Sequence, residues 1–260
     1  MKINNNNGHT ISGLGSGAVG YLNESEETRN IGYYFVEGMK SLGHTVYDCT
    51  IDKSSSYLYE AVKKANRNKS DLAISHHLNC HSNKSANGVE VWVYDMSHKD
   101  TVEKAKKICE EISKLGFVNR GVKANPKFYW LGHTNDKAMI IEYCFCSNEG
   151  DSKKYNAKKM AYAAIKALTN IDLNTTKPTT NNPIEADYKY ENGSYNVKAT
   201  IIGTNGKGLN IREDRNVNSK ILGTFKEGQV IEVNYCLNNW FSTWSGGQKG
   251  YVNGKYIKLY

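Results

Sequence analysis

The first two-thirds of the chain alternates short apolar runs with longer segments in which apolar residues recur every three or four positions. The longer segments predict amphipathic helices over residues 23–43, 55–67, 100–115 and 152–168. Gly43 and Gly116 stand where the first and third helices are expected to end. Asn23 and Glu26 have the spacing of a capping box, which indicates where the first helix begins.

The apolar runs between these helices have the length of β-strands. The predicted strands are Thr45–Tyr47, Leu72–His76, Val89–Tyr94 and Ala138–Tyr143. Strands that alternate with helices in this way are typical of an α/β domain, with a mostly parallel sheet and helices on both faces. We therefore expect residues 1–170 to form an α/β domain.

The pattern changes after residue 170. Residues 171–195 are rich in Asn and Thr, contain Pro178 and Pro183, and have the composition of a linker. Over residues 196–260 the helical period disappears, and short apolar runs are separated by Gly and Asn. The strands expected there are 198–202, 208–212, 220–224, 229–233, 240–243 and 250–252. This segment predicts a small all-β, SH3-like barrel.

Charge and composition limit the classes of partner. The formal net charge is +8, and residues 196–260 carry nine Lys and Arg against four Asp and Glu. Such an excess favours a polyanionic surface, either nucleic acid or an anionic cell-wall polymer. The basic residues form no stripe with nucleic-acid reading motifs, so we expect no nucleic-acid partner. No apolar run approaches the ~20 residues that span a bilayer, so membrane insertion is not expected.

The six cysteines are scattered and form no CxxC pair, which argues against a zinc ribbon or a disulfide framework. We expect reduced thiols from cytoplasmic synthesis. The first residues also lack the apolar run of a signal peptide.

Polar residues at strand ends indicate one chemical site. His9 follows a short first strand, His77 stands at the end of the strand from Leu72, and Glu142 interrupts the apolar run 138–143. In a parallel sheet such positions lie at the carboxyl edge where ligands bind, and Glu24 could join them from the first helix. Two imidazoles and a carboxylate are a common ligand set for catalytic zinc. A further carboxylate, best supplied by Glu142, could move the proton in amide hydrolysis.

Each residue also has a simpler interpretation. His9 could be a turn residue, and Glu24 a first-turn carboxylate favoured by the helix dipole. Glu142 could be a structural acid paired with Lys137 or Arg120. Strand alternation sends His76 and His77 to opposite faces, so one of them should have no ligand role. From the residues alone, metal hydrolase is one interpretation among several.

The motifs in order resemble the zinc-dependent N-acetylmuramoyl-L-alanine amidase family over about residues 1–168. They are Gly8-His9, Asn23-Glu24, Ser75-x-His77-x-Asn79, Gly88-Val89-Glu90-Val91, Arg120-Gly121-Val122-Lys123 and Ile141-Glu142. The resemblance implies that His9, Glu24 and His77 bind zinc and that Glu142 is the catalytic glutamate. It also implies hydrolysis of the amide bond between N-acetylmuramic acid and L-alanine in peptidoglycan.

Two positions depart from this pattern or leave a choice. The first strand is Ile3 followed by four asparagines, where the family has an apolar run. Glu26 and Glu27 lie close to Glu24. We select Glu24 as the ligand because its separation from Gly43 matches the family pattern.

The tail resembles bacterial SH3-type domains, with Gly208–Arg212, Trp240 and Gly250–Val252 as the matching segments. The resemblance implies binding to peptidoglycan and to anionic wall polymers. An aromatic groove is expected from Tyr235, Trp240, Trp244 and Tyr251. The alternative is that Trp240 and Tyr251 belong to the barrel core.

The expected function is therefore a bacteriolytic wall hydrolase of the endolysin or autolysin type. It would be made in the cytoplasm without a signal peptide and would act on the wall after release. Two alternatives remain at this point: a zinc peptidase that cuts the stem peptide, and a wall-binding protein without catalysis.

Overall fold

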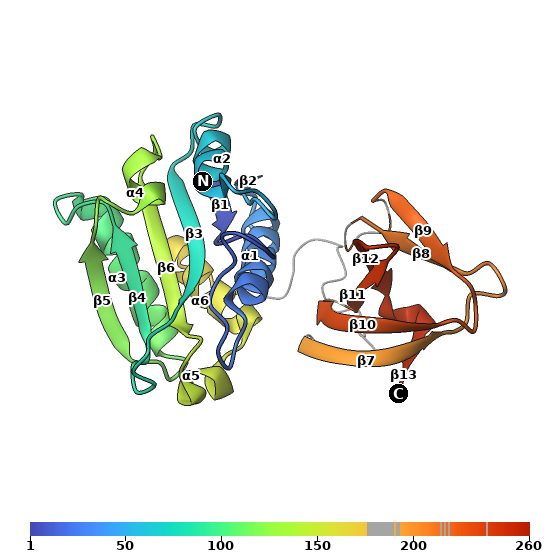
Figure 1. Cartoon of the computed structure of the whole chain (residues 1–260). Coiled ribbons are helices and arrows are strands. Elements are labelled where there is room, and N and C mark those ends of the chain that lie inside the picture. The colour runs from blue at the N-terminus through green and yellow to red at the C-terminus, as the bar shows by residue number, and fades with distance from the viewer. Residues whose placement is uncertain (176–189, 191–192, 214, 216, 218, 238) are drawn as a thin grey trace. The chain divides into compact units, whose positions relative to one another are not determined.

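The computed structural model describes residues 1–175, 190, 193–213, 215, 217, 219–237 and 239–260. The chain divides into two compact units, residues 1–180 and 181–260, which are considered separately (Figure 1). Most of the predicted linker, residues 171–195, lies outside the described residues. At its start, Leu173 packs against the core of the first unit and Asp172 forms an ion pair with Lys166.

The first unit is built on a six-stranded sheet in the order β2-β1-β3-β6-β4-β5. Its strands are β1 Lys2–Asn7, β2 Thr45–Asp48, β3 Leu72–Asn79, β4 Val89–Val93, β5 Asn119–Ala124 and β6 Ala138–Phe145. Every pairing is parallel except that between β4 and β6. The predicted mostly parallel sheet is confirmed.

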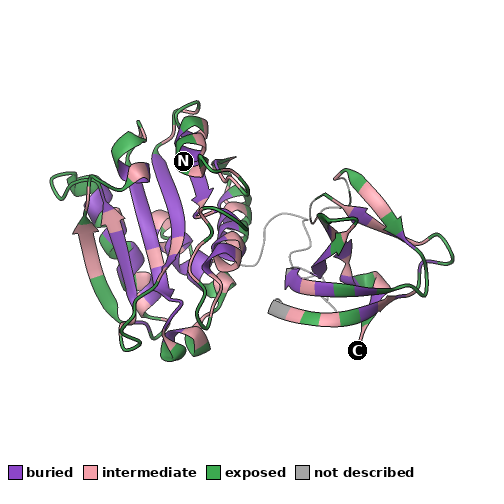
Figure 2. Ribbon diagram, viewed as in Figure 1, coloured by how far each residue is buried: buried purple, intermediate pink, exposed green. Residues whose placement is uncertain are grey.

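Helices cover both faces of this sheet, as predicted. They are α1 Glu24–Ser41, α2 Tyr57–Ala65, α3 Lys99–Ser113, α4 Tyr129–His133, α5 Glu149–Lys154 and α6 Ala157–Thr169. Apolar residues of α1, α3 and α6 form one core with one face of the sheet, which includes Ile74 of β3. Residues of α2 and α4 form a second core with the opposite face, which includes Ala73. Figure 2 shows β3 and β6 largely buried, as central strands covered on both faces should be.

Three local predictions need correction. The helix expected over 152–168 is two helices, α5 and α6, because the Asn156 side chain accepts a hydrogen bond from the Lys159 backbone N–H at 2.9 Å and caps a new helix. The Asn23 side chain makes no capping bond at the start of α1. The strand β5 was not predicted, because it is an exposed edge strand with Gly121 at φ 77° and no apolar alternation.

The asparagine-rich first strand is buried, and its side chains find hydrogen-bond partners. Asn4 is fully buried, and its amide donates to the backbone carbonyls of Ala65 and Asn68 at 3.0 and 3.1 Å. Asn6 donates to Ser75 Oγ at 2.8 Å. Buried amides are tolerated when they are bonded in this way, so the polar strand keeps its place between β2 and β3.

The second unit is an antiparallel sheet in the order β13-β7-β10-β11-β12-β8-β9, which confirms the predicted all-β class. Its strands are β7 Gly193–Ile201, β8 Leu209–Arg212, β9 Ile221–Phe225, β10 Val230–Leu237, β11 Trp240–Ser245, β12 Gln248–Asn253 and β13 Ile257–Leu259. Its core includes Val233, Phe241 and Val252. The three-residue β13, which follows the 3-10 turn Gly254–Tyr256, is too short to have been predicted.

Among the described helices, none has the length and apolar character that crossing a membrane would require.

Candidate functional site

Three side chains from three different elements meet at the carboxyl edge of the sheet. His9 follows β1, Glu24 is the first residue of α1, and His77 lies near the end of β3. One nitrogen or oxygen of each lies within 4.8 Å of the others. Glu24 Oε1 is 3.1 Å from His9 Nε2 and 3.2 Å from His77 Nδ1. The structure thus brings together the three residues predicted as metal ligands, and this group could hold a metal ion.

The approach of the two histidines depends on the turn after β1. His9 has a positive φ of 66°, which points its ring back toward β3. A side chain at Gly8 would place its Cβ 2.3 Å from His77 Cε1, so only glycine leaves room for that ring. His9 Nδ1 is hydrogen-bonded to the Gly15 carbonyl at 3.1 Å, which leaves Nε2 directed toward Glu24.

Glu24 is held as a buried carboxylate. Its Oε2 accepts from the Ala18 N–H at 3.0 Å, and its Oε1 accepts from the Leu78 N–H at 3.1 Å. Burial alone would raise the pKa of Glu24, but hydrogen bonds from His77 and His9 outweigh burial and lower it. Burial lowers the pKa of His77, which favours the neutral imidazole that a metal requires.

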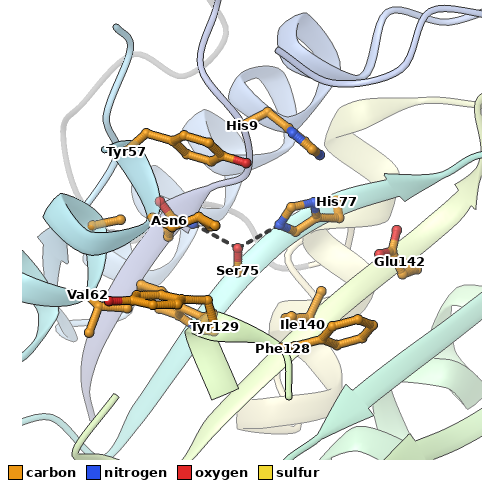
Figure 3. Close-up of a pocket in the computed structure, with 13 residues that line it drawn as sticks. Asn6, His9, Tyr57, Val62, Ser75, His77, Phe128, Tyr129, Ile140 and Glu142 are labelled. Atoms are coloured by element: carbon orange, nitrogen blue, oxygen red, sulfur yellow. Dashed lines mark hydrogen bonds between the residues drawn. The ribbon is translucent and has the colours of Figure 1, made fainter. Parts of the chain in front are cut away.

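A second layer of side chains orients His77. Its Nε2 lies 3.0 Å from Ser75 Oγ, and Ser75 accepts a further hydrogen bond from the Asn6 amide at 2.8 Å (Figure 3). Such partners set the tautomer and ring orientation of a ligating histidine. Sequence reasoning did not assign a role to Ser75 or Asn6. The two-residue spacing of Ser75 and His77, which places them on one face of β3, was the available signal.

His76 points to the opposite face, as strand alternation predicted. It is fully buried, with Nδ1 at 2.9 Å from the Tyr143 hydroxyl and Nε2 at 2.8 Å from Asn5 Oδ1. Burial lowers its pKa to about 3, so it is a neutral structural residue. Only His77 of the pair reaches the candidate site.

Glu142 faces the same site from β6, where it is the register partner of His77. Its Oε2 is buried and has no hydrogen-bond partner among the described residues. Burial raises the pKa of Glu142 well above its ordinary value, and the charges of Glu24 and Glu90 raise it further. The structural acid interpretation is not supported, because Lys137 pairs with Asp100 and Arg120 pairs with Glu90.

Two cavities meet at Glu142. The first, of about 270 Å³, is mainly apolar and contains the His77 and Ser75 side chains (Figure 3). Its apolar wall consists of Tyr57, Leu58, Ala61, Val62, Phe128, Tyr129, Trp130 and Ile140. The second, of about 570 Å³, has a mixed lining, in which Asn79, Glu90 and Arg120 lie beside Trp92, Phe128 and Phe145. A substrate bound across both cavities would pass Glu142.

The aromatic residues predicted to bind the wall differ in exposure. Trp244 is 59% exposed, whereas Tyr235 and Trp240 are buried. Tyr251 is half-buried, with the Arg215 guanidinium 4.3 Å from its ring centroid. Tyr251 pairs with Ser242, so it shares a face of the sheet with Trp240 and Trp244. That these residues form a ligand groove stays a prediction.

Comparisons with known proteins match parts of both units of the chain. The family model described as N-acetylmuramoyl-L-alanine amidase matches residues 6–171, and the bacterial SH3 domain model matches residues 207–258. An uncharacterized Clostridium perfringens protein is 34% identical over 163 residues, which cover 61% of this chain and 48% of that protein. The chain therefore matches about half the length of this curated relative.

Solved structures share the fold of the first unit. The catalytic domain of the CD27L endolysin targeting Clostridium difficile is 27% identical, with a TM-score of 0.61, and the match covers 66% of this chain and 99% of that domain. An N-acetylmuramoyl-L-alanine amidase from Clostridium difficile, at 20% identity and a TM-score of 0.58, supports the fold alone; its match covers 64% of this chain and 94% of that one. Through its first domain, the chain belongs to the N-acetylmuramoyl-L-alanine amidase family.

Proposed function

We propose that this protein hydrolyses the amide bond between N-acetylmuramic acid and L-alanine in bacterial peptidoglycan, with zinc held by His9, Glu24 and His77. The observation that carries the proposal is the position of Glu142. It lies on β6, next to the strand that carries His77, and it faces the group formed by His9, Glu24 and His77. Family membership supports the same bond as the substrate.

The donor set fits zinc. Two imidazoles and one carboxylate are a common protein ligand set for catalytic zinc, and they leave one position open. Ligand atoms about 2 Å from a tetrahedral ion lie about 3.3 Å apart, close to the 3.1 and 3.2 Å that separate Glu24 Oε1 from the two histidines. Zinc bound there would supply a Lewis acid for the amide carbonyl and for the attacking water.

The protein's own groups provide the proton transfer. Glu142 accepts the proton of the attacking water and returns it to the leaving nitrogen of L-alanine. Its raised pKa makes it a stronger base than an ordinary carboxylate. Ser75 and Gly8 keep the His77 ring in place while this occurs.

The second domain is proposed to hold the enzyme on the wall. The match to a bacterial SH3 domain and the excess of positive charge in residues 196–260 support peptidoglycan and anionic wall polymers as its ligands. We retain domain boundaries of 1–170 and 196–260, with residues 171–195 as the linker. After release from the cytoplasm, a protein with these two activities would cut the wall and lyse the bacterium.

The test is digestion of purified peptidoglycan with and without a chelator, followed by mass analysis and labelling of new amino groups. We expect L-alanine amino termini to appear, to disappear with chelator, and to return with zinc. Glu142→Gln should remove the products, whereas the exposed Glu103→Gln should match the wild type. New termini within the stem peptide would establish a peptidase instead, and intact walls would leave only a wall-binding protein.

A further inference from the structure

A buried carboxylate next to Glu142 holds two cationic side chains. Glu90 has a side chain that is only 3% exposed, and its Oε2 accepts hydrogen bonds from Arg120 Nε and Lys123 Nζ, each at 2.6 Å. The Arg120 and Lys123 side chains are 33% and 35% exposed. One carboxylate therefore faces two cations, and the cluster has an excess positive charge.

The cluster lies beside the catalytic edge of the sheet. Glu90 on β4 is the register partner of Glu142 on β6, and Arg120 comes from the next strand, β5. The two strand spacings between Arg120 and Glu142 correspond to about 10 Å. Arg120 and Glu142 both line the second cavity, of about 570 Å³. Lys123 is not among its lining residues and lies over the Trp92 ring, 5.2 Å from the centroid.

Arg120 keeps hydrogen-bonding capacity for a ligand. Its Nε donates to Glu90, and its Nη1 lies 3.4 Å from the Asn87 carbonyl. A guanidinium has five N–H groups, and among the described residues only these two groups accept from Arg120. The ion pair with Glu90 and the Phe145 ring, whose centroid is 5.0 Å from the guanidinium carbon, hold the side chain at the cavity with little rotamer freedom left to lose.

We propose that Arg120 binds a carboxylate of the stem peptide, namely the free α-carboxylate of the D-glutamate that follows L-alanine. The inference rests on the proposed amidase function, which places the scissile bond at Glu142. An extended chain advances about 3.3–3.6 Å per residue. The Arg120 position is about 10 Å from Glu142, and the arginine side chain covers part of this distance. A carboxylate that it binds therefore belongs to one of the first few residues of the stem. Arginine matches a carboxylate through paired N–H donors, which an uncharged amide cannot replace.

The test compares two muramyl tripeptides that differ at one group. In both, L-alanine and the second residue are followed by L-lysine amide, and the α-carboxyl group of the second residue is either free or amidated. We expect wild-type protein with zinc to have a KM about tenfold lower for the free carboxylate, with similar kcat. Arg120→Gln should abolish the preference by raising the KM for the free form only.

Lys123→Gln is the matched control, since it removes an equal bond to Glu90 without changing the lining of the cavity. It should keep the preference, and because the readout is a ratio of two substrates, loss of folded protein does not alter it. A ratio that is unchanged in Arg120→Gln, or lost equally in Lys123→Gln, would overturn the assignment while the amidase function stands. If wild-type protein cleaves neither tripeptide at the L-alanine amide, the proposed function fails and this inference fails with it.

Discussion

His77 and Glu142 occupy paired positions on the neighbouring parallel strands β3 and β6, and their side chains leave the same face of the sheet (Figure 3). Side chains at paired positions of adjacent strands lie close together. The proposed metal ligand His77 and the proposed proton acceptor Glu142 are thus placed side by side by backbone pairing alone. The other two proposed ligands, His9 and Glu24, come from a turn and a helix terminus, and their side chains lie close to His77.

Glu142→Gln should separate catalysis from stability. Removing the proton acceptor should lower kcat by about 10²–10⁴-fold, while zinc stays bound at equal stoichiometry. The buried Oε2 has no partner among the described residues, so the neutral amide should also leave the thermal midpoint of the metal-free protein unchanged or higher. Peptidoglycan assays, metal analysis and calorimetry check the three parts. A large fall in the midpoint would show that Glu142 is a structural residue.

Ser75→Ala should weaken zinc binding because His77 Nε2 loses its hydrogen-bond partner. The expected loss is about 10–100-fold in affinity, the usual effect of removing such a partner. Competition with a fluorescent chelator measures it without any substrate. Ser152→Ala, which removes an exposed hydroxyl from α5, should bind zinc like the wild type. Equal affinity in the two variants would contradict an orienting role for Ser75.

Gly8→Ala should displace the His77 ring, since the new Cβ would lie 2.3 Å from Cε1. We expect a destabilisation of about 1–3 kcal/mol, the usual cost of overpacking, together with weaker zinc binding. Gly223→Ala provides the comparison, because its nearest neighbour would be 3.4 Å away. Denaturant unfolding and zinc titration of both variants provide the measurement. An unaffected Gly8→Ala protein would mean that the ring has room to move.

Glu90 should make the stability of the first unit depend on acid pH. Burial raises its pKa, but hydrogen bonds from Arg120 and Lys123 outweigh burial, so the folded pKa lies below the ordinary 4.5. A lowered carboxyl pKa stabilises the fold above pH 4.5, and this contribution is lost as pH falls through the folded value. Glu90→Gln should therefore be less stable than the wild type at pH 7, and the difference should shrink below pH 4.5. Urea unfolding at several pH values measures it; a constant difference would argue against the ion pairs as its source.

Trp244 and Trp240 should respond differently to alanine. Trp244 is largely exposed, so Trp244→Ala should keep the thermal midpoint and reduce binding to purified walls. Trp240 is buried, so Trp240→Ala should cost about 3–5 kcal/mol of stability. Sedimentation with walls and thermal unfolding of the full chain distinguish a binding residue from a core residue. Undiminished wall binding by Trp244→Ala would remove it from the proposed groove.

The sequence predicted the α/β class and the all-β tail, and its resemblance to the amidase family picked out His9, Glu24, His77 and Glu142. Hydrophobic periodicity reports burial on a helix or strand face, and strand ends of a parallel sheet share one edge, so local patterns were sufficient for the fold classes and for the edge where the site lies. The choice of Glu24 over Glu26 came from a family spacing, and the structure places the Glu24 carboxylate between the two histidines.

Only the tertiary structure decided how these residues act together. The exposed strand β5 had no apolar alternation, so the pattern could not reveal it, and with it the Glu90, Arg120 and Lys123 cluster stayed hidden. The bond from Asn6 to Ser75 joins β1 to β3, which are far apart in the chain, and the bond from Ser75 to His77 continues the layer within β3. Strand register and long-range packing set the contact between Asn6 and Ser75, which is why the complete orienting layer and the second cavity emerged only from the fold.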